Sequence, residues 1–156
     1  VVVTDSADLY EKLFYNLNTT GAVLSPFDSY QLIRGLKTLS LRMERSTANA
    51  QEIVAFLEQS SAVKEVLYTG RGGMISFKVA DEKRIPHILN TLKVFSFAES
   101  LGGVESLITY PTTQTHADIP AEVRHSYGLT DDLLRLSIGI EDARDLIEDL
   151  RQALEG

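Results

Sequence analysis

The sequence of 156 residues has no cysteine, carries fewer basic than acidic side chains and contains no long apolar run. Without cysteine, neither a disulfide framework nor a thiolate metal site can form, which agrees with a reducing cytoplasm. With 15 basic against 22 acidic residues the net charge is −7, which argues against a surface for nucleic acid or anionic membrane. No apolar stretch approaches the roughly 20 residues of a membrane span, and no signal-peptide pattern is present. We therefore expect a cytoplasmic protein that binds neither nucleic acid nor membrane.

The sequence does contain a regular succession of short helices and strands. A hydrophobic fraction of 44% with 24% charged residues is typical of a globular domain. Alternation and short apolar runs predict strands over residues 63–68, 74–79, 94–98, 106–110 and 133–139. Capping residues and apolar periodicity predict helices over residues 5–17, 28–60, 81–92 and 141–156. This order predicts an α+β fold, a small and mainly antiparallel sheet with helices packed on one side.

The longest periodic segment runs from about residue 28 to residue 60. A helix of about 30 residues would be some 45 Å long, too long for a small domain to cover alone. We expect its polar middle, "RMERSTAN", to face solvent or to mark a bend. The stretch "TGRGG", which joins the first two predicted strands, is compatible with a hairpin turn.

Arg135 stands inside the apolar run "LLRLSIG". If the run is a strand, alternation places Leu134 and Leu136 on one face and Arg135 and Ser137 on the other. A guanidinium stays charged, so that its position among apolar residues is costly unless it is paired. Two interpretations are open at this point. Arg135 is either a fork that binds a ligand carboxylate, or part of a structural salt bridge or a solvated sheet face.

The stretch "SFAESLGGVESLITYPTTQTH", residues 96–116, interrupts two strand-like runs with Glu99, Ser100 and a glycine pair. The glycines would let backbone amides approach an anion, with the serine as a further donor. The alternative is a bulged turn that needs glycine. Thr115 and His116 follow in a polar loop, and three dispersed histidines without cysteine predict no metal site. The residues alone therefore predict one candidate anion clamp, and no nucleophile or general base.

Three blocks of the sequence, taken together, resemble one enzyme family. The blocks are "GAVLSPFDSYQLIRGLKTLSLRME", "SFAESLGGVESLITYPTTQTH" and "DDLLRLSIGIEDARDLIEDLRQAL". They are similar to the C-terminal part of the Cys/Met-metabolism enzymes that depend on pyridoxal 5'-phosphate. That family includes cystathionine γ-synthase, cystathionine β- and γ-lyases, methionine γ-lyase and O-acetylhomoserine sulfhydrylase. The resemblance covers nearly the whole chain, and it implies the C-terminal part of the fold-type I architecture.

The resemblance implies roles for five residues. Ser100 and Arg135 match the serine of "ESLGG" and the arginine of "RLSxG", which in the family hold the α-carboxylate of the substrate. Thr115 matches the threonine of a "P-x-x-x-T-H" motif that supports this pocket. Glu99 matches a position that helps to set substrate preference, and glutamate there resembles the cystathionine synthases and γ-lyases more than methionine γ-lyase. Asn18 matches a position that reaches the neighbouring subunit's active site, which implies a homotetramer built from two catalytic dimers.

The chain also departs from the family pattern. Family members are more than twice as long, and their cofactor-binding lysine lies in an "S-x-T-K" motif before the position of Val1. None of the six lysines here lies in such a motif, so we expect no catalytic and no cofactor-binding residue within this chain. The family has an additional helical segment at the point where Gly70 and Arg71 adjoin. We therefore predict a missing segment there, the alternative being a genuine fragment or deletion.

These considerations predict three regions and a function. Residues 1–27 would be the end of the large cofactor domain and a loop, 28–60 a connecting helix, and 61–156 the C-terminal α+β domain. The chain would recognise the substrate carboxylate in a pyridoxal-phosphate-dependent enzyme that acts on cystathionine or activated homoserine by elimination or replacement at Cβ or Cγ. The partner would be a small amino acid. The alternative is a stand-alone, non-catalytic module that binds amino acids or another subunit.

Overall fold

The computed structural model describes residues 2–156. The chain divides into two compact units, Val1–Leu39 and Ser40–Gly156. Within the described residues, no helix combines the length and the apolar character needed to cross a membrane.

The first unit contains two helices, α1 (Ala7–Thr20) and α2 (Pro26–Leu36). The hydroxyl of Ser6 accepts a hydrogen bond from the backbone amide of Leu9, so that this serine is the N-cap of α1. Ser25 caps α2 in the same way. Neither helix has a buried residue, and the apolar side chains of this unit therefore lack a core of their own.

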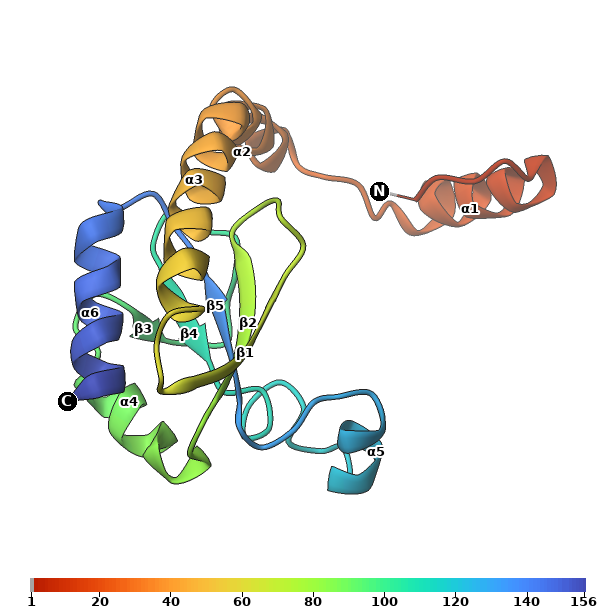
Figure 1. Ribbon diagram of the computed structural model, residues 1–156. Helices are drawn as coiled ribbons and strands as arrows, with labels where there is room; N and C mark the ends of the chain where they lie inside the picture. The colour runs from red at the N-terminus through yellow and green to blue at the C-terminus, as the bar shows by residue number, and fades with distance from the viewer. Residues whose placement is uncertain (1) are drawn as a thin grey trace. The chain divides into compact units, whose positions relative to one another are not determined.

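The second unit is built on one five-stranded sheet (Figure 1). Its strands, in the spatial order β1-β2-β5-β4-β3, are β1 (Val63–Tyr68), β2 (Met74–Val79), β5 (Leu133–Ser137), β4 (Leu107–Thr109) and β3 (Ser96–Phe97). All neighbours are antiparallel except β3 and β4, which are parallel. The predicted strands and the mainly antiparallel sheet are thus confirmed, although β3 has only two residues.

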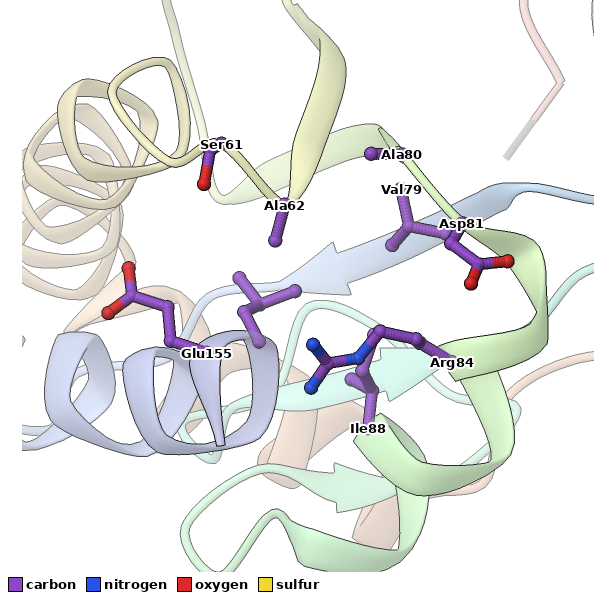
Figure 2. A pocket seen from close by; sticks show the side chains of 9 residues that line it. Ser61, Ala62, Val79, Ala80, Asp81, Arg84, Ile88 and Glu155 are labelled. Carbon is purple, nitrogen blue, oxygen red and sulfur yellow. The ribbon is translucent and has the colours of Figure 1, made fainter.

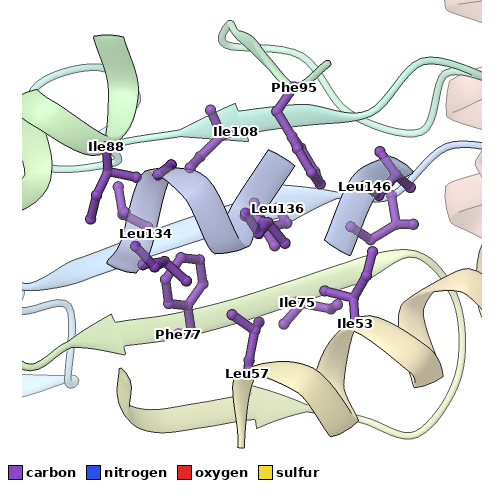
Figure 3. Packing of buried hydrophobic residues seen from close by; sticks show 14 of the residues in the cluster. Ile53, Leu57, Ile75, Phe77, Ile88, Phe95, Ile108, Leu134, Leu136 and Leu146 are labelled. Atoms are coloured by element: carbon purple, nitrogen blue, oxygen red, sulfur yellow. The ribbon is translucent and has the colours of Figure 1, made fainter. Parts of the chain in front are cut away.

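Three helices cover one face of this sheet, namely α3 (Leu39–Leu57), α4 (Ile85–Thr91) and α6 (Ala143–Glu155). A short 3-10 helix, η1 (Glu82–Arg84), precedes α4. Figure 3 shows apolar side chains of α3 and α6 against those of the sheet. The fully buried members of this core include Ile53, Leu57, Phe77, Leu136 and Leu146. Removing such surfaces from water is the main stabilising contribution to the unit.

The prediction of one helix over residues 28–60 is wrong, because α2 ends at Leu36 and α3 begins at Leu39. Gly35 weakens the last turn of α2, since glycine costs about 1 kcal/mol relative to alanine in a helix. The hydroxyl of Thr38 donates to the carbonyl of Gly35 and so offers that carbonyl a partner other than a helical amide. The predicted boundary at residue 60 also moves, since residues from Ser40 onward belong to the α+β unit.

The expectation that the polar middle of the long helix faces solvent holds only in part, since Met43, Glu44, Arg45 and Ala48 are exposed. Ser46 and Asn49 of α3 are buried. The Asn49 side-chain amide donates to the backbone carbonyls of Gly139 at 3.1 Å and Glu141 at 2.9 Å. A buried amide with two such partners ties α3 to the turn that follows β5.

The helix α5 (Ala121–Ser126) lies in a stretch that the sequence predicted as irregular. Arg124 of this helix is buried, and its guanidinium donates to the carbonyl of Ile119 and pairs with Asp131. The sequence does not predict this helix, because the segment is polar and has no apolar stripe over several turns.

The connection between β1 and β2 is a closed turn through Gly70–Gly73. Gly70 and Gly72 have φ values of 82° and 79°, which side chains other than glycine rarely adopt. The hydroxyl of Tyr68 donates to the carbonyl of Gly72 at 2.8 Å, and the amide of Gly72 donates to the hydroxyl of Thr47 at 3.1 Å. The turn is therefore fixed both to its own strand and to α3.

Asp149 of α6 holds the backbone segment that leads from α4 into the edge strand β3. Its carboxylate is buried and accepts three backbone hydrogen bonds, from Lys93 at 2.8 Å, Val94 at 2.8 Å and Phe95 at 3.0 Å. Three amides that would otherwise lack a partner at the end of α4 are thus satisfied by one side chain.

We predict that Asp149→Ala in the intact protein lowers the free energy of unfolding by roughly 2–4 kcal/mol, because buried amides lose their acceptor. Asp145→Asn, an exposed change in the same helix, is the control and should shift the unfolding midpoint little. Thermal unfolding and hydrogen exchange of the Lys93–Phe95 amides would be measured. Unchanged protection of these amides in the alanine variant would contradict the assignment.

Candidate functional site

Arg135 lies at the centre of the sheet face that the helices do not cover. Its neighbours in β5, Leu134 and Leu136, are both fully buried against the helices, while Arg135 is half-buried. Successive side chains of a strand point to opposite faces, so the burial of the two leucines directs Arg135 to the open face. The predicted alternation of this strand is confirmed.

The neighbours of Arg135 across the sheet are hydroxyl residues. Ser76 of β2 pairs with Arg135 on one side, and Thr109 of β4 pairs with it on the other. On the same face, the Lys78 ammonium forms a 2.7 Å ion pair with Glu65. The hydrogen bond to Glu65 raises the pKa of Lys78, so the ammonium stays protonated, and the Glu65 carboxylate balances its charge.

Arg135 differs from Lys78 in having no such partner. Among the side chains of residues 2–156, none forms a hydrogen bond or ion pair with the Arg135 guanidinium. A half-buried guanidinium without a counter-charge is unfavourable unless an anion is supplied from outside. The geometry therefore argues against a structural salt bridge, and it is compatible both with a binding site for an anion and with a solvated sheet face.

Glu99 and Ser100 lie in an arch between β3 and β4. The arch is fixed on one side at Ala98, whose amide donates to the carbonyl of Ile108 at 3.1 Å. It is fixed on the other side at Gly102, whose amide donates to the hydroxyl of Ser137 at 2.9 Å. Glu99 and Ser100 are exposed, and neither side chain has a hydrogen-bond partner among the described residues. Both remain available to a ligand.

The end of the arch is joined to the turn after β5 by a buried polar cluster of Ser106, Gly139 and Glu141. The Glu141 carboxylate accepts from the Ser106 amide at 2.7 Å and from its hydroxyl at 2.9 Å. The same hydroxyl accepts from the amide of Gly139 at 2.9 Å. The cluster holds the arch and the continuation of β5 in one arrangement. No local pattern predicts it, because Ser106 lies 33 positions before Gly139 and 35 before Glu141.

Glycine is required on both sides of this contact. Gly102 has a φ of 77°, in the left-handed region. A Cβ on Gly139 would lie 2.1 Å from the carbonyl oxygen of Val104, so a side chain there would push the two segments apart. A cavity of about 190 Å³ lies beside the arch and is bordered by Leu101 and Met43, among others. In the predicted glycine pair, Gly102 therefore serves the turn through its left-handed backbone, whereas the close backbone contact is made at Gly139.

Thr115 lies in the turn that follows β4. The amide of His116 donates to the carbonyl of Pro111 at 2.9 Å, and the amide of Tyr110 donates to the side chain of Gln114 at 2.8 Å. The hydroxyl of Thr115, which is exposed, lies 2.7 Å from Nδ1 of His116. The structure therefore places Thr115 in a folded turn shortly after Thr109, the strand partner of Arg135.

Asn18 belongs to the other unit, where it is exposed in the last turn of α1. The sequence expectation of a loop at this position is wrong, because α1 continues to Thr20 and ends at Gly21, which has a φ of 65°.

A separate pocket of about 340 Å³ lies near the C-terminal end of α6 (Figure 2). Arg84 and Asp81 border it, and its apolar lining includes Val79 and Ile88. Asp81 already accepts a hydrogen bond from the amide of Lys83 as the N-cap of η1. None of the predicted site residues borders this pocket, so we assign the candidate site to the open face around Arg135.

Comparison with known proteins identifies the family to which the chain belongs. The sequence pattern of the family described as "Cys/Met metabolism PLP-dependent enzyme" matches residues 1–155. A cystathionine gamma-synthase/O-acetylhomoserine (thiol)-lyase of Bacillus subtilis is 56% identical over 154 residues, which is 99% of this chain and 41% of that protein. A cystathionine gamma-lyase of the same organism is 49% identical over 171 residues, covering 99% of this chain and 45% of that protein.

A solved structure has the same fold. The cystathionine gamma synthase of Xanthomonas oryzae pv. oryzae, in complex with aminoacrylate and cysteine, superposes with a TM-score of 0.88 at 40% identity. The match covers 98% of this chain and 44% of that one. The chain thus spans less than half the length of the proteins that it matches.

Proposed function

Because the chain belongs to the Cys/Met metabolism PLP-dependent enzyme family, we propose that it is the part of a transsulfuration enzyme that recognises the α-carboxylate of the amino-acid substrate. The single observation that carries this proposal is the unpartnered guanidinium of Arg135 on the open sheet face. The substrate would be cystathionine or an activated homoserine. The stand-alone binding module is not favoured, because enzymes of this family match the chain along nearly its whole length.

Four residues of the chain would contribute different groups to the recognition of the substrate. Arg135 supplies a planar fork that matches both oxygens of a carboxylate. Ser100, exposed in the arch, supplies a hydroxyl donor, and Thr115 supports the same region from the turn after β4. Glu99 is exposed next to Ser100, where a carboxylate can select the distal group of the substrate. Together these groups would orient the amino acid and leave the reacting carbons free.

Pyridoxal phosphate is the cofactor of this family, and when bound it supplies the electron sink for elimination and replacement. We propose that it is held through a lysine outside these 156 residues. Three lysines of the chain do not fit that role, since Lys12, Lys64 and Lys78 form ion pairs with carboxylates. The recognition of the carboxylate is therefore the share of the reaction that this chain contributes.

We further propose the family's homotetramer, in which Asn18 reaches the active site of a neighbouring subunit. Helix α1 supports this assembly, because it carries exposed apolar side chains such as Leu9, Tyr10 and Phe14 but no buried residue. A helix of this kind is stable only when another surface covers its apolar side chains.

Alignment lengths favour the synthase over the lyases. Both Bacillus relatives match 99% of this chain, yet the alignment runs over 154 residues for the synthase/thiol-lyase and over 171 for the gamma-lyase. The additional positions therefore belong to the lyase. We propose, in place of the segment predicted between Gly70 and Arg71, that the direct connection is native, as its ordered turn supports.

We predict that Arg135→Ala in the intact protein raises KM for the amino-acid substrate roughly 10- to 150-fold, which corresponds to about 1.5–3 kcal/mol for a charge-assisted contact. The absorbance of the bound cofactor should not change. Lys78→Ala is the matched control, because it removes a cation of the same face whose charge Glu65 balances. Its KM should stay roughly within twofold of that of the unchanged protein. An unchanged KM in the Arg135 variant would show that the carboxylate binds elsewhere.

The synthase proposal is tested by the relative rates of two reactions of the intact protein. We expect replacement of the acetoxy group of O-acetylhomoserine by the thiol of cysteine, with release of acetate, to have a higher kcat/KM than the cleavage of cystathionine. Tryptic peptides from the same preparation should include Glu65–Arg71, which spans the direct connection. Cystathionine cleavage as the faster reaction, together with a longer peptide at this point, would place the protein with the lyases.

A further inference from the structure

We propose that Thr109 and Ser137 are positioning residues. Their hydroxyls hold the arch in the position that places Ser100 opposite Arg135. The inference rests on the proposed function, since it assumes that Arg135 and Ser100 bind one carboxylate. It concerns two side chains that bind no substrate themselves. Their place in the fold shows what they contribute.

Thr109 supports the first end of the arch. It is 2% exposed, and its hydroxyl donates to the carbonyl of Ala98 at 2.9 Å. Thr109 is also the direct strand partner of Arg135, so that its side chain lies on the same face of the sheet. The position at which the arch leaves β3 is therefore set by a residue adjacent to the guanidinium.

Ser137 supports the second end of the arch. It is 4% exposed, and its hydroxyl accepts a hydrogen bond from the amide of Gly102 at 2.9 Å. Because it follows Arg135 by two positions in β5, it shares the open face with the guanidinium. The two anchors of the arch thus flank Arg135, one on the neighbouring strand and one along its own strand.

Little else holds the arch between these anchors. Leu101 is 56% exposed and borders a cavity, so apolar packing within this chain does not fix it. The side chains of Glu99 and Ser100 have no hydrogen-bond partners among the described residues. The next fixed point, the carbonyl of Val104, which accepts from the amide of Ile140, lies further along the arch. Besides the backbone hydrogen bond from Ala98 to Ile108, the two buried hydroxyls are therefore the contacts that set the height of Ser100 above the sheet.

This arrangement has a specific consequence for binding. If either hydroxyl is removed, the arch relaxes and the Ser100 donor moves relative to Arg135. The binding of a carboxylate is then weakened, whereas a ligand without a carboxylate loses nothing, because it never used this pair of groups. A purely structural contribution of the hydroxyls would weaken both ligands alike.

The test uses the intact protein with its cofactor and two competing inhibitors. The inhibitors are L-2-aminobutyrate and propylamine, which has the same carbon skeleton and amine without the carboxylate. Thr109→Val and Ser137→Ala remove one hydroxyl each, while Thr109→Ser and Ser137→Thr retain it. In each hydroxyl-deficient variant we expect the inhibition constant of L-2-aminobutyrate to rise about 5- to 10-fold relative to that of propylamine. The conservative variants should keep the original ratio.

Three outcomes separate the inference from the function on which it rests. An equal loss for both inhibitors, or no change of the ratio in either hydroxyl-deficient variant, would overturn the positioning role. Arg135→Ala is measured in the same assay. If its ratio were unchanged, the proposed function itself would fail. If only Arg135→Ala changed the ratio, the clamp would stand and the positioning residues would be wrong. The two substitutions lie on different strands, so one variant that fails to fold leaves the other to decide.

Discussion

The alternation of side chains along β5 is the constraint on which the rest of this structure depends. Leu134 and Leu136 must enter the core under α3 and α6, and this requirement leaves Arg135 no other place than the uncovered face. A charged group is thereby held in the middle of a sheet, with fixed neighbours on both sides and no counter-charge among the described residues. The burial of the leucines on one face of the strand and the position of Arg135, for which we propose a role in recognition, on the other face are consequences of the same register.

Polar contacts, rather than apolar ones, set the course of the arch that carries Glu99 and Ser100. The arch with Glu99 and Ser100 has exposed apolar neighbours, and its course is set by backbone groups bound to buried hydroxyls and to the Glu141 carboxylate. Such contacts are directional, so they fix distances more narrowly than hydrophobic burial does. The glycines at 102 and 139 make these contacts possible, one through its dihedral angle and one through the close approach of Val104.

Patterns within a single element could be predicted from the sequence, whereas contacts between distant elements could not. Period-two alternation was sufficient to place Arg135 and Ser137 on one face. The pairing of Arg135 with Ser100 comes from the family resemblance and stays a prediction. The break after Leu36 was missed because a single glycine competes weakly with a long apolar periodicity. Asn49 looked like a solvent-exposed residue, because its buried partners are carbonyls some 90 positions away. Alternation also places Ser137 beside Arg135, but it does not indicate that the Ser137 hydroxyl accepts from the amide of Gly102, 35 positions away.

The most direct test of this account is a crystal structure of the intact protein with a bound, unreactive amino acid such as L-2-aminobutyrate. The account predicts that both carboxylate oxygens lie about 2.7–2.9 Å from guanidinium nitrogens of Arg135, the range of charge-assisted hydrogen bonds. The hydroxyl of Ser100 should lie within hydrogen-bond distance of the same carboxylate. If Arg135 were instead paired with a carboxylate of the protein, and the amino acid were bound by other groups, the central claim would be contradicted.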